Sequence, residues 1–351
     1  MPRTLWRVAI AGLLWIGAVG CSSTQGSGNG GAGGTGGAGG SGPMAEATWT
    51  ERGTFNVWIS VASSADGAKL VAVANYIYTS ADSGATWTQT GTRQEWSSVA
   101  SSADGTKLVA AGWGTYDAAS GGYDGGYIYT SADSGATWTQ TGTQQKWVSV
   151  ASSADGTKLS AVALGDNGGY VYASADAGVT WTKTSAQDAW QSVASSADGT
   201  KLVAVTNDGS YGGYIYTSVD SGASWTQTGT HLPWNSVASS ADATKLVATE
   251  LGGYIYTSPD FGVTWTSGGI DNEWWTSVAS SADGTKLAAV AHWSGIYTSA
   301  DSGLTWTETR SRHDDWMSVA SSADGTKLVA ASAHTQSGDS GHIYTYSVPV
   351  P

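Results

Sequence analysis

Side chains able to take part in chemistry occur in two settings in this sequence, one repeated and one irregular. In the repeated setting, aspartate stands in short phrases such as Ala-Asp-Gly-Thr and Ser-Ala-Asp-Ser-Gly. In the irregular setting, tryptophan, tyrosine, histidine, arginine and further carboxylates occur in segments that differ from copy to copy. Aromatic rings beside carboxylates are a plausible sugar-binding mixture, and paired carboxylates can hydrolyse glycosides. Imidazole together with carboxylate can bind a transition metal.

The longest irregular segment runs from Gly112 to Asp124 and combines aromatic rings with carboxylates, which makes it a candidate sugar-binding loop. The alternative is a solvated loop whose tryptophan folds onto the rim of the fold. Tryptophan and arginine in other irregular segments are also candidates, because these residues are frequent at binding hot spots. The candidate ligand-binding residues are Trp113, Tyr116, Asp117, Tyr123, Trp274, Trp293, Arg310 and Arg312.

Four histidines gather towards the C-terminus, with Asp314 and Asp315 among them. They are His292, His313, His334 and His342. Their spacing matches no metal-binding motif within one element, so we expect surface histidines, no metal and no cofactor. The single cysteine excludes a disulfide framework and a cysteine-built zinc site.

Internal repeats indicate which elements position these residues. The phrase Trp-x-Ser-Val-Ala-Ser-Ser-Ala-Asp begins at Trp58, Trp96, Trp147, Trp190, Trp234, Trp275 and Trp316. Each copy predicts a strand A, an Asp-Gly turn and a strand B, followed by a variable loop, a Tyr-Ile-Tyr-Thr-Ser strand C, a second turn and a strand D. Four short strands in a unit of about forty residues are typical of a propeller blade. A solenoid is the alternative, but it requires capping repeats at both ends.

The two ends of the repeated region complement each other. The last repeat stops after its strand C, near Thr345, while an unaccompanied strand D, residues 47–50, precedes the first repeat. Pairing of these two strands would remove the edges that an open array exposes. The fold class predicted is therefore all-β, a seven-bladed β-propeller of four-stranded blades over residues 44–351, with its ring closed by the N-terminal strand D.

The second turn resembles the Asp-box, Ser-x-Asp-x-Gly-x-Thr-Trp, of sialidase-type (BNR) propellers. Full copies begin at Ser80, Ser131, Ser174, Ser258 and Ser299, and a sixth, at Ser218, has Ser224 in place of threonine. Proteins with this motif include sialidases, sortilin-like receptors, two-propeller xyloglucanases and photosystem II assembly factors, so the resemblance implies a blade and not a reaction. The chain lacks the Arg-Ile-Pro motif of sialidases, so no catalytic residue of theirs carries over. The basic patch of the photosystem factors has no counterpart in this acidic chain.

The repeated polar and aromatic residues have structural explanations. Each Asp-box carboxylate should accept hydrogen bonds from its own turn, and one carboxylate is too few for calcium, which takes six to eight oxygens. These structural aspartates are Asp82, Asp133, Asp176, Asp220, Asp260 and Asp301. Lysine three residues after the first-turn aspartate, as in Asp104 and Lys107, predicts a solvated pair within the turn; a basic binding ring is the alternative. The tryptophan that begins strand A and the tyrosine that begins strand C should fill the space between blades, although lectin-like aromatic platforms are an alternative.

The first residues resemble an export signal. Arg3 and Arg7 precede an apolar run that is too short to span a bilayer and ends just before Cys21. Residues 1–20 resemble a bacterial lipoprotein signal peptide, with Cys21 lipidated; a plain signal peptide is the alternative. Residues 21–43 then form a lipidated cysteine and a flexible Gly/Ser-rich linker. We expect a protein of the bacterial cell envelope, attached to the outer membrane through this lipid alone.

Charge and the two ends of the blades limit the function. A net charge of −13 argues against a nucleic-acid partner. The A–B and C–D turns share one side of the ring, here called the turn side, while the varied B–C and D–A loops share the other, the loop side. We expect a monomeric, non-enzymatic binding module or scaffold that recognises a protein or glycan on its loop side. The alternative is a glycoside hydrolase using paired carboxylates there, such as Glu250 with Asp271 or Glu273.

Overall fold

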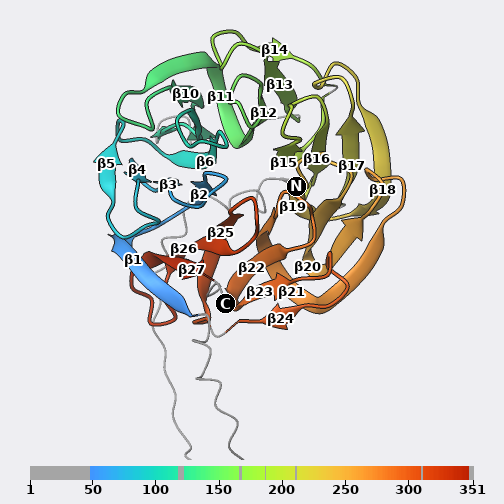
Figure 1. Ribbon diagram of the computed structural model, residues 1–351. Helices are drawn as coiled ribbons and strands as arrows, with labels where there is room; N and C mark the ends of the chain where they lie inside the picture. Colours follow the sequence, from blue (N-terminus) through green and yellow to red (C-terminus); the bar gives the residue numbers. More distant parts are fainter. Residues whose placement is uncertain are drawn as a thin grey trace, which may run out of the picture. The chain divides into compact units, whose positions relative to one another are not determined.

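Strands and tight turns make up the described part of the protein in this computed structural model, which comprises residues 48–117, 122–165, 168–185, 187–209, 212–309 and 311–347. No helix occurs in these ranges, so none there is long and apolar enough to cross a membrane. The strands are paired antiparallel and the sheets are arranged side by side around a common centre (Figure 1). The prediction of an all-β fold built from four-stranded antiparallel units is confirmed.

Repeats are numbered here from 1 to 7 by their strand A tryptophans, and their strands follow the order A to D along the chain. Repeat 1 comprises β2 (Ser60–Ser63), β3 (Leu70–Val73), β4 (Ile77–Ser80) and β5 (Thr88–Thr90). Repeat 2 comprises β6 (Trp96–Ser101), β7 (Leu108–Gly112), β10 (Gly126–Ser131) and the first half of β11 (Thr139–Ser152), with a small hairpin, β8 (Tyr116–Asp117) and β9 (Gly122–Tyr123), in its B–C loop. Repeat 3 comprises the second half of β11, β12 (Leu159–Leu164), β13 (Tyr170–Ser174) and β14 (Thr182–Lys183).

The remaining repeats follow the same order. Repeat 4 comprises β15 (Trp190–Ser195), β16 (Leu202–Thr206), β17 (Gly213–Ser218) and β18 (Thr226–Leu232). Repeat 5 comprises β19 (Trp234–Ser239), β20 (Leu246–Ser258), which supplies strands B and C, and the first half of β21 (Thr266–Ser280). Repeat 6 comprises the second half of β21, β22 (Leu287–Ser294), β23 (Ile296–Ser299) and β24 (Thr307–Glu308). Repeat 7 comprises β25 (Asp314–Ser321), β26 (Lys327–His334) and β27 (Gly341–Ser347), and β27 pairs antiparallel with β1 (Trp49–Asn56).

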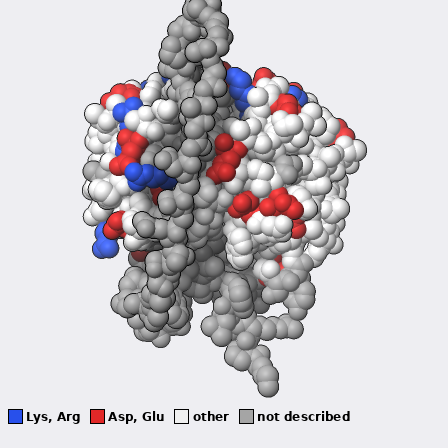
Figure 2. All heavy atoms as spheres, turned by 90° about the horizontal axis from the view of Figure 1, so that it is seen from below, with Lys and Arg blue, Asp and Glu red and all other residues white. Residues whose placement is uncertain are grey.

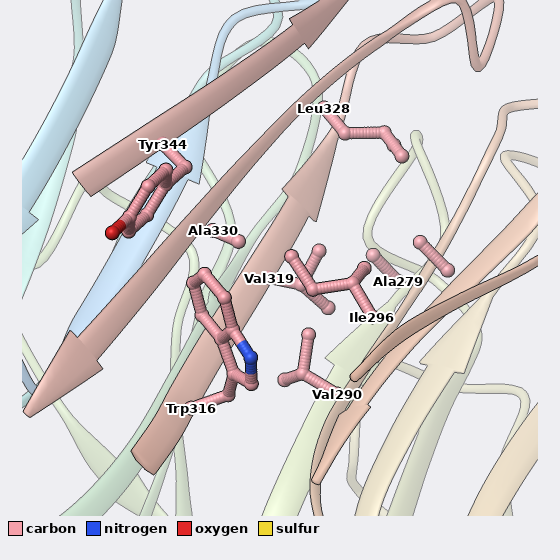
Figure 3. Close-up of a cluster of buried hydrophobic side chains, with 9 residues drawn as sticks. Ala279, Val290, Ile296, Trp316, Val319, Leu328, Ala330 and Tyr344 are labelled. Atoms are coloured by element: carbon pink, nitrogen blue, oxygen red, sulfur yellow. The ribbon is translucent and has the colours of Figure 1, made fainter. Parts of the chain in front are cut away.

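The apolar cores lie between consecutive repeats. Figure 3 shows one of them, in which Trp316 and Leu328 of repeat 7 pack against Val290 and Ile296 of repeat 6. A corresponding cluster joins repeat 7 to repeat 1, where Ile343 lies among residues that include Trp58. Strand B is buried along its length because it lies between two strands of its own sheet and between two neighbouring sheets. Each sheet is therefore stabilised by the sheets on either side of it.

Backbone hydrogen bonds connect the A–B turns of successive repeats. One alanine in each turn donates its N–H to the carbonyl of the equivalent alanine in the next repeat, at 2.7–2.8 Å. The series is Ala65, Ala103, Ala154, Ala197, Ala241, Ala282 and Ala323, and Ala323 donates in turn to Ala65. In a second series, each strand A valine donates its N–H to a serine hydroxyl of the preceding repeat; Val61, for example, donates to Ser318 Oγ at 3.2 Å. Polar groups at the inner strands are satisfied by neighbouring repeats.

The turn lysines also link repeats, and the prediction of solvated pairs within one turn is wrong. Lys107 Nζ donates to the carbonyl of Asp155, in the next repeat, at 2.8 Å. The equivalent bonds run from Lys201 to Asp242, from Lys286 to Asp324 and from Lys327 to Asp66. The turn glycine makes room for the lysine stem, because a Cβ on Gly105 would lie 2.8 Å from Cβ and Cδ of Lys69.

The tryptophans that begin strand A belong to the core. All seven are buried, with at most 4% of their surface exposed. Each packs against the second tyrosine of strand C in its own repeat or its aligned equivalent, with ring centroids 4.9–5.2 Å apart, as for Trp58 and Tyr78. The strand A tryptophans are therefore packing residues, and the platform alternative is wrong for them. The tyrosines that begin strand C do not share this burial: Tyr254 is 41% exposed, and Tyr76, Tyr127, Tyr170 and Tyr214 are half-buried.

Candidate functional site

The long B–C loop of repeat 2 folds back on itself. Tyr116 lies opposite Tyr123 in the β8–β9 hairpin, next to Asp117. The Trp113 ring meets Tyr123 edge-on, with centroids 6.1 Å apart, and the Trp113 backbone N–H donates to the carbonyl of Glu95 at 2.7 Å. The half-buried Trp113 ring thus lies against the hairpin, as the rim alternative describes, and does not form an open stacking surface.

Two other candidate tryptophans are presented to solvent. Trp274 and Trp293 are 58% and 53% exposed, whereas the other tryptophans of the described part of the chain are buried or half-buried. Trp274 lies on β21, opposite Leu251 of β20. Trp293 lies on β22, between His292 and Ser294, at the bulge where β22 pairs with β25 of repeat 7.

The backbone of Trp293 is strained. Its φ is +53°, a left-handed conformation that costs a bulky residue on the order of 1–3 kcal/mol. The pairings of His292 with Asp315 and of Ser294 with Asp314 hold the bulge from both sides. The fold therefore maintains an exposed indole at an unfavourable backbone position, and such strain is concentrated at functional sites.

A chain of polar contacts connects the two exposed tryptophans. Tyr297 donates to Glu273 Oε1 at 3.4 Å, and the Tyr297 hydroxyl lies 3.0 Å from Ser294 Oγ. Glu273 directly precedes Trp274, and Ser294 directly follows Trp293. The two indoles therefore belong to residues on either side of one hydrogen-bonded link between β21, β22 and β23.

Two further carboxylates, on β20 and β21, accept hydrogen bonds from residues of strand C in repeat 5. Glu250 Oε2 accepts from the Tyr254 N–H and the Tyr256 hydroxyl, both at 3.3 Å, and Asp271 Oδ2 accepts from the Tyr254 hydroxyl at 3.4 Å. Tyr254 is 41% exposed. We call the set Glu250, Tyr254, Asp271, Glu273, Trp274 and Trp293 the aromatic–acidic patch.

The residues that repeat 5 contributes to the patch include carboxylates but no basic side chain. Residues 246–285 contain no lysine, arginine or histidine. Their acids on the loop side are Glu250, Asp271 and Glu273, and the described partners of these carboxylates are tyrosine hydroxyls and a backbone N–H. Figure 2 shows one face of the molecule, on which some acidic side chains lie beside basic ones and others lie apart from them.

Tyrosine–carboxylate pairs recur in other repeats, which explains part of this arrangement structurally. Tyr216 donates to Asp188 at 3.1 Å, and Tyr344 donates to Asp314 at 3.3 Å. Burial, followed by the charge of the paired carboxylate, raises the pKa of Tyr216 and of Tyr256 to about 12. These tyrosines stay protonated at neutral pH, so they are suited to donating hydrogen bonds and not to nucleophilic attack.

The histidines pair with carboxylates, and two of them share Asp315. His292 Nδ1 contacts Asp315 Oδ1, and His334 Nδ1 lies 3.4 Å from Asp315 Oδ2. His313 Nε2 lies 2.7 Å from Glu308 Oε1. Within the described ranges, no group of three or more histidine, cysteine, aspartate or glutamate side chains is arranged to hold a metal ion.

His342 differs from the expectation of surface histidines. It is only 4% exposed, and its Nδ1 lies 3.2 Å from Glu51 Oε1 of β1. Phe55 of β1 packs edge-on against the His342 ring, with centroids 4.2 Å apart. The ring is buried because β1 covers it, a contact that depends on residues far apart in sequence.

The remaining predicted residues belong to the D–A connection after repeat 6 or to the first residues of the chain. Arg312 is exposed, and its carbonyl accepts from Trp316 Nε1 at 3.0 Å. Arg310 and Cys21 lie outside the described residues.

The carboxylates of the C–D turns are occupied by their own turns. Asp82 Oδ1 accepts from the Ser80 hydroxyl and from the Thr86 N–H, both at 2.8 Å, and Oδ2 accepts from the Thr86 hydroxyl at 2.6 Å. These bonds, led by that of the Thr86 hydroxyl, lower the pKa of Asp82 to about 2. Asp133, Asp176, Asp220, Asp260 and Asp301 have the same set of partners.

The turn side also contains a cavity that the sequence did not suggest. It has a volume of about 220 Å³ between repeats 1 and 2 and is lined mainly by hydroxyls, including Thr79, Thr88 and Ser101. Lys69, which also lines it, donates to Ser134 Oγ at 3.3 Å. The cavity offers no aromatic ring, in contrast to the aromatic–acidic patch.

Comparison with known proteins identifies the fold. Searches against family models and against curated proteins found no match. Among solved structures, YCF48 bound to D1 peptide is 14% identical with a TM-score of 0.61, and the alignment covers 87% of this chain and 97% of that one. The β-propeller domain of Cps50 (Swd1) from Myceliophteria thermophila is 12% identical with a TM-score of 0.64, covering 86% and 100%. The GH74 enzyme of Niastella koreensis is 15% identical with a TM-score of 0.50, covering 79% and 62%. Together with the repeated four-stranded sheets, these similarities show that the chain has a β-propeller fold.

Proposed function

We propose that this protein is a non-enzymatic binding module that recognises a protein or glycan through its loop side. The observation that carries the proposal is the exposure of Trp274 and Trp293 on either side of one hydrogen-bonded link, with Trp293 held in a strained conformation. Exposed tryptophans beside polar groups are frequent at binding hot spots. A peptide-bound propeller among the similar structures, YCF48 with D1 peptide, supports binding as a use of this fold.

The scaffold that we propose is a seven-bladed ring of the Asp-box, sialidase-type (BNR) class, in which β1 is the fourth strand of the last blade. The antiparallel pairing of β1 with β27 supports closure, as does the hydrogen bond from Ala323 to Ala65. The apolar cluster between repeats 7 and 1 supports it too. In a closed ring the loop-side segments of all repeats hold fixed positions, so a single asymmetric site can be built from several of them.

The proposed location is the bacterial cell envelope. It depends on the sequence of residues 1–43, read as a lipoprotein signal with a lipidated Cys21 and a Gly/Ser-rich tether. A tethered monomer of this kind would present its loop side to partners outside the membrane, with the lipid as its one membrane contact.

A glycoside hydrolase remains the second candidate function. The GH74 enzyme among the similar structures favours it, and Glu250 with Asp271 or Glu273 would be the paired carboxylates. The contacts of Glu250 and Glu273 argue for binding instead, because both accept from the strand C tyrosine that pairs with a carboxylate in other repeats, as Tyr216 does with Asp188.

The test is a screen of the purified full-length protein on glycan and peptide arrays, followed by mass spectrometry of any bound glycan after prolonged incubation. We expect binding without turnover, weakened by about 1–2 kcal/mol in Trp274→Ala or Trp293→Ala. Val263→Ala and Leu304→Ala, at 80% and 78% exposed positions on the turn side, are matched controls and should bind as the parent does. Cleaved glycan would support the hydrolase, and loss of binding only in the turn-side variants would show that the site is elsewhere.

A further inference from the structure

We infer that the aromatic–acidic patch binds a cationic segment of a partner protein, one that presents arginine or lysine side chains. The inference deepens the proposed binding function and depends on it, because it assigns chemistry to the same site. It follows from two independent properties of the patch, the exposure of its rings and the sign of its charge.

The rings offer the face that a cation requires. Tyr254, Trp274 and Trp293 are 41%, 58% and 53% exposed, and tryptophan is the aromatic side chain with the strongest attraction for cations. Elsewhere in the protein the fold already uses this interaction: Lys183 Nζ lies 4.0 Å above the Tyr170 ring centroid. No lysine or arginine of the described residues has such a contact with the three rings of the patch, so their faces are open to a cation from outside.

Charge determines which class of partner fits. The carboxylates of Glu250, Asp271 and Glu273 meet tyrosine hydroxyls and a backbone N–H, which do not neutralise them. On the turn side, by contrast, lysines lie beside the repeated aspartates, and the charge of Lys69 acts on Asp104. The loop-side segments of repeat 5 carry these three carboxylates and no basic residue, whereas those of repeat 6 also carry His292, Arg310, Arg312 and His313. The negative potential that attracts cations and repels anions therefore belongs to repeat 5.

A cationic peptide uses both properties, whereas a neutral glycan uses only one. Arginine can stack its guanidinium plane on an indole and donate in parallel to a carboxylate. A neutral sugar can stack on the rings, but it gains little from the negative charge. The net charge of −13 would further speed the approach of a basic partner at low ionic strength.

The test measures binding of short fluorescent peptides to the full-length protein by anisotropy. One peptide alternates glycine with arginine, the second replaces each arginine by citrulline, which has the same shape without charge, and the third replaces it by glutamate. We expect the arginine peptide to bind, the citrulline peptide to bind at least about tenfold more weakly, and the glutamate peptide not to bind. Raising NaCl from about 0.05 M to about 0.5 M should weaken the arginine complex severalfold.

Variants then locate the site. Trp274→Ala, Trp293→Ala and Asp271→Asn should each weaken the arginine complex about fivefold while leaving the melting temperature unchanged, because all three side chains are exposed. Asp208→Asn removes the same charge from a loop of repeat 4, and Val263→Ala removes an exposed apolar group from the turn side; both should bind the peptide as the parent does.

Three outcomes would overturn the inference: equal binding of the arginine and citrulline peptides, equal loss in Asp208→Asn and Asp271→Asn, or no binding of the arginine peptide. A labelled neutral oligosaccharide is included to distinguish failure of the cationic-partner inference from failure of the proposed binding function. If it binds and depends on Trp274 while the arginine peptide does not bind, the cationic partner is wrong but the proposed binding function stands. If the oligosaccharide is cleaved, the proposed function itself is wrong.

Discussion

Removal of the Trp49 side chain tests whether β1 joins the first and last repeats into a closed ring. Trp49 is half-buried, its ring lies 5.1 Å from that of Tyr346, and its Nε1 donates to Thr309 Oγ1 at 2.9 Å. It also packs against the cluster that contains Trp316. The side chain therefore connects β1 to both repeat 6 and repeat 7, across nearly the whole length of the chain.

The magnitude follows from these contacts. A fully buried tryptophan costs about 3–5 kcal/mol when truncated to alanine, so a half-buried one should cost about 2. The hydrogen bond to Thr309 adds about 1 kcal/mol, since its loss leaves a partner unsatisfied. We expect Trp49→Ala to lower the free energy of unfolding by about 2–3 kcal/mol, measured by urea denaturation followed by far-UV circular dichroism. Trp274→Ala is the matched control: it makes the same chemical change at a 58% exposed ring and should shift stability by less than about 0.5 kcal/mol.

Deletion of residues 44–52 extends the same test. It removes the part of β1 that pairs with Ile343, Tyr344, Thr345 and Tyr346 and leaves β27 as an open edge. We expect a lower melting temperature and concentration-dependent association, measured by calorimetry and analytical ultracentrifugation. A shortened protein as stable and as monomeric as the parent, together with Trp49→Ala behaving like Trp274→Ala, would refute closure and favour an open array.

Three further predictions concern other parts of the chain. The pKa of Asp82 and of Asp104 is lowered to about 2, below the unfolded value near 3.8. The contribution of these carboxylates to stability is therefore complete above about pH 4 and is lost as the pH falls towards 2. The melting temperature should drop over that interval, and it should drop less steeply in Asp104→Asn. Gly105→Ala should destabilise the protein by about 1–3 kcal/mol in urea denaturation, because the φ of Gly105 is +65° and the new methyl group would meet Lys69. Ala243→Gly, at the equivalent turn with φ +56°, should change stability by less than about 1 kcal/mol. Equal losses in both variants would contradict the explanation. Cys21→Ser should abolish metabolic labelling by a clickable fatty acid, and equal labelling of both proteins would disprove the lipid anchor.

The strands and turns of this fold could be predicted because their signals are local. Alternation of apolar and polar residues, with glycine after aspartate, defines each hairpin within a few residues, and the repeated phrase multiplies the signal. The direction of the turn lysines could not be predicted in the same way. Lys107 is three residues from Asp104 in sequence, but it bonds to Asp155, and this contact depends on how one repeat packs on the next.

The candidate site was predictable only in part, for the same reason. Trp113, Trp274 and Trp293 look equivalent in sequence. The hairpin of repeat 2 packs against Trp113, however, whereas Trp274 and Trp293 are exposed. One local signal does distinguish Trp274. It precedes Trp275, a core tryptophan of the repeated phrase, and neighbouring residues of a strand point to opposite faces. The pairing of His292 with Asp315 has no local signal, because it joins strands of different repeats.

The uniform bonds between the A–B turns have a consequence for the order of the chain. The bond from Ala323 to Ala65 is chemically the same as each of the others, so no turn of the series is distinguished as the first or the last. Thr345 of β27 lies opposite Thr50 of β1, as Thr79 lies opposite Thr88 within repeat 1, where the C–D turn connects the two strands. A turn copied from residues 80–87 should therefore be able to join β27 to β1. A circular permutant made in this way, with new termini in the D–A loop between β14 and β15, would retain the complete series of hydrogen bonds between the A–B turns.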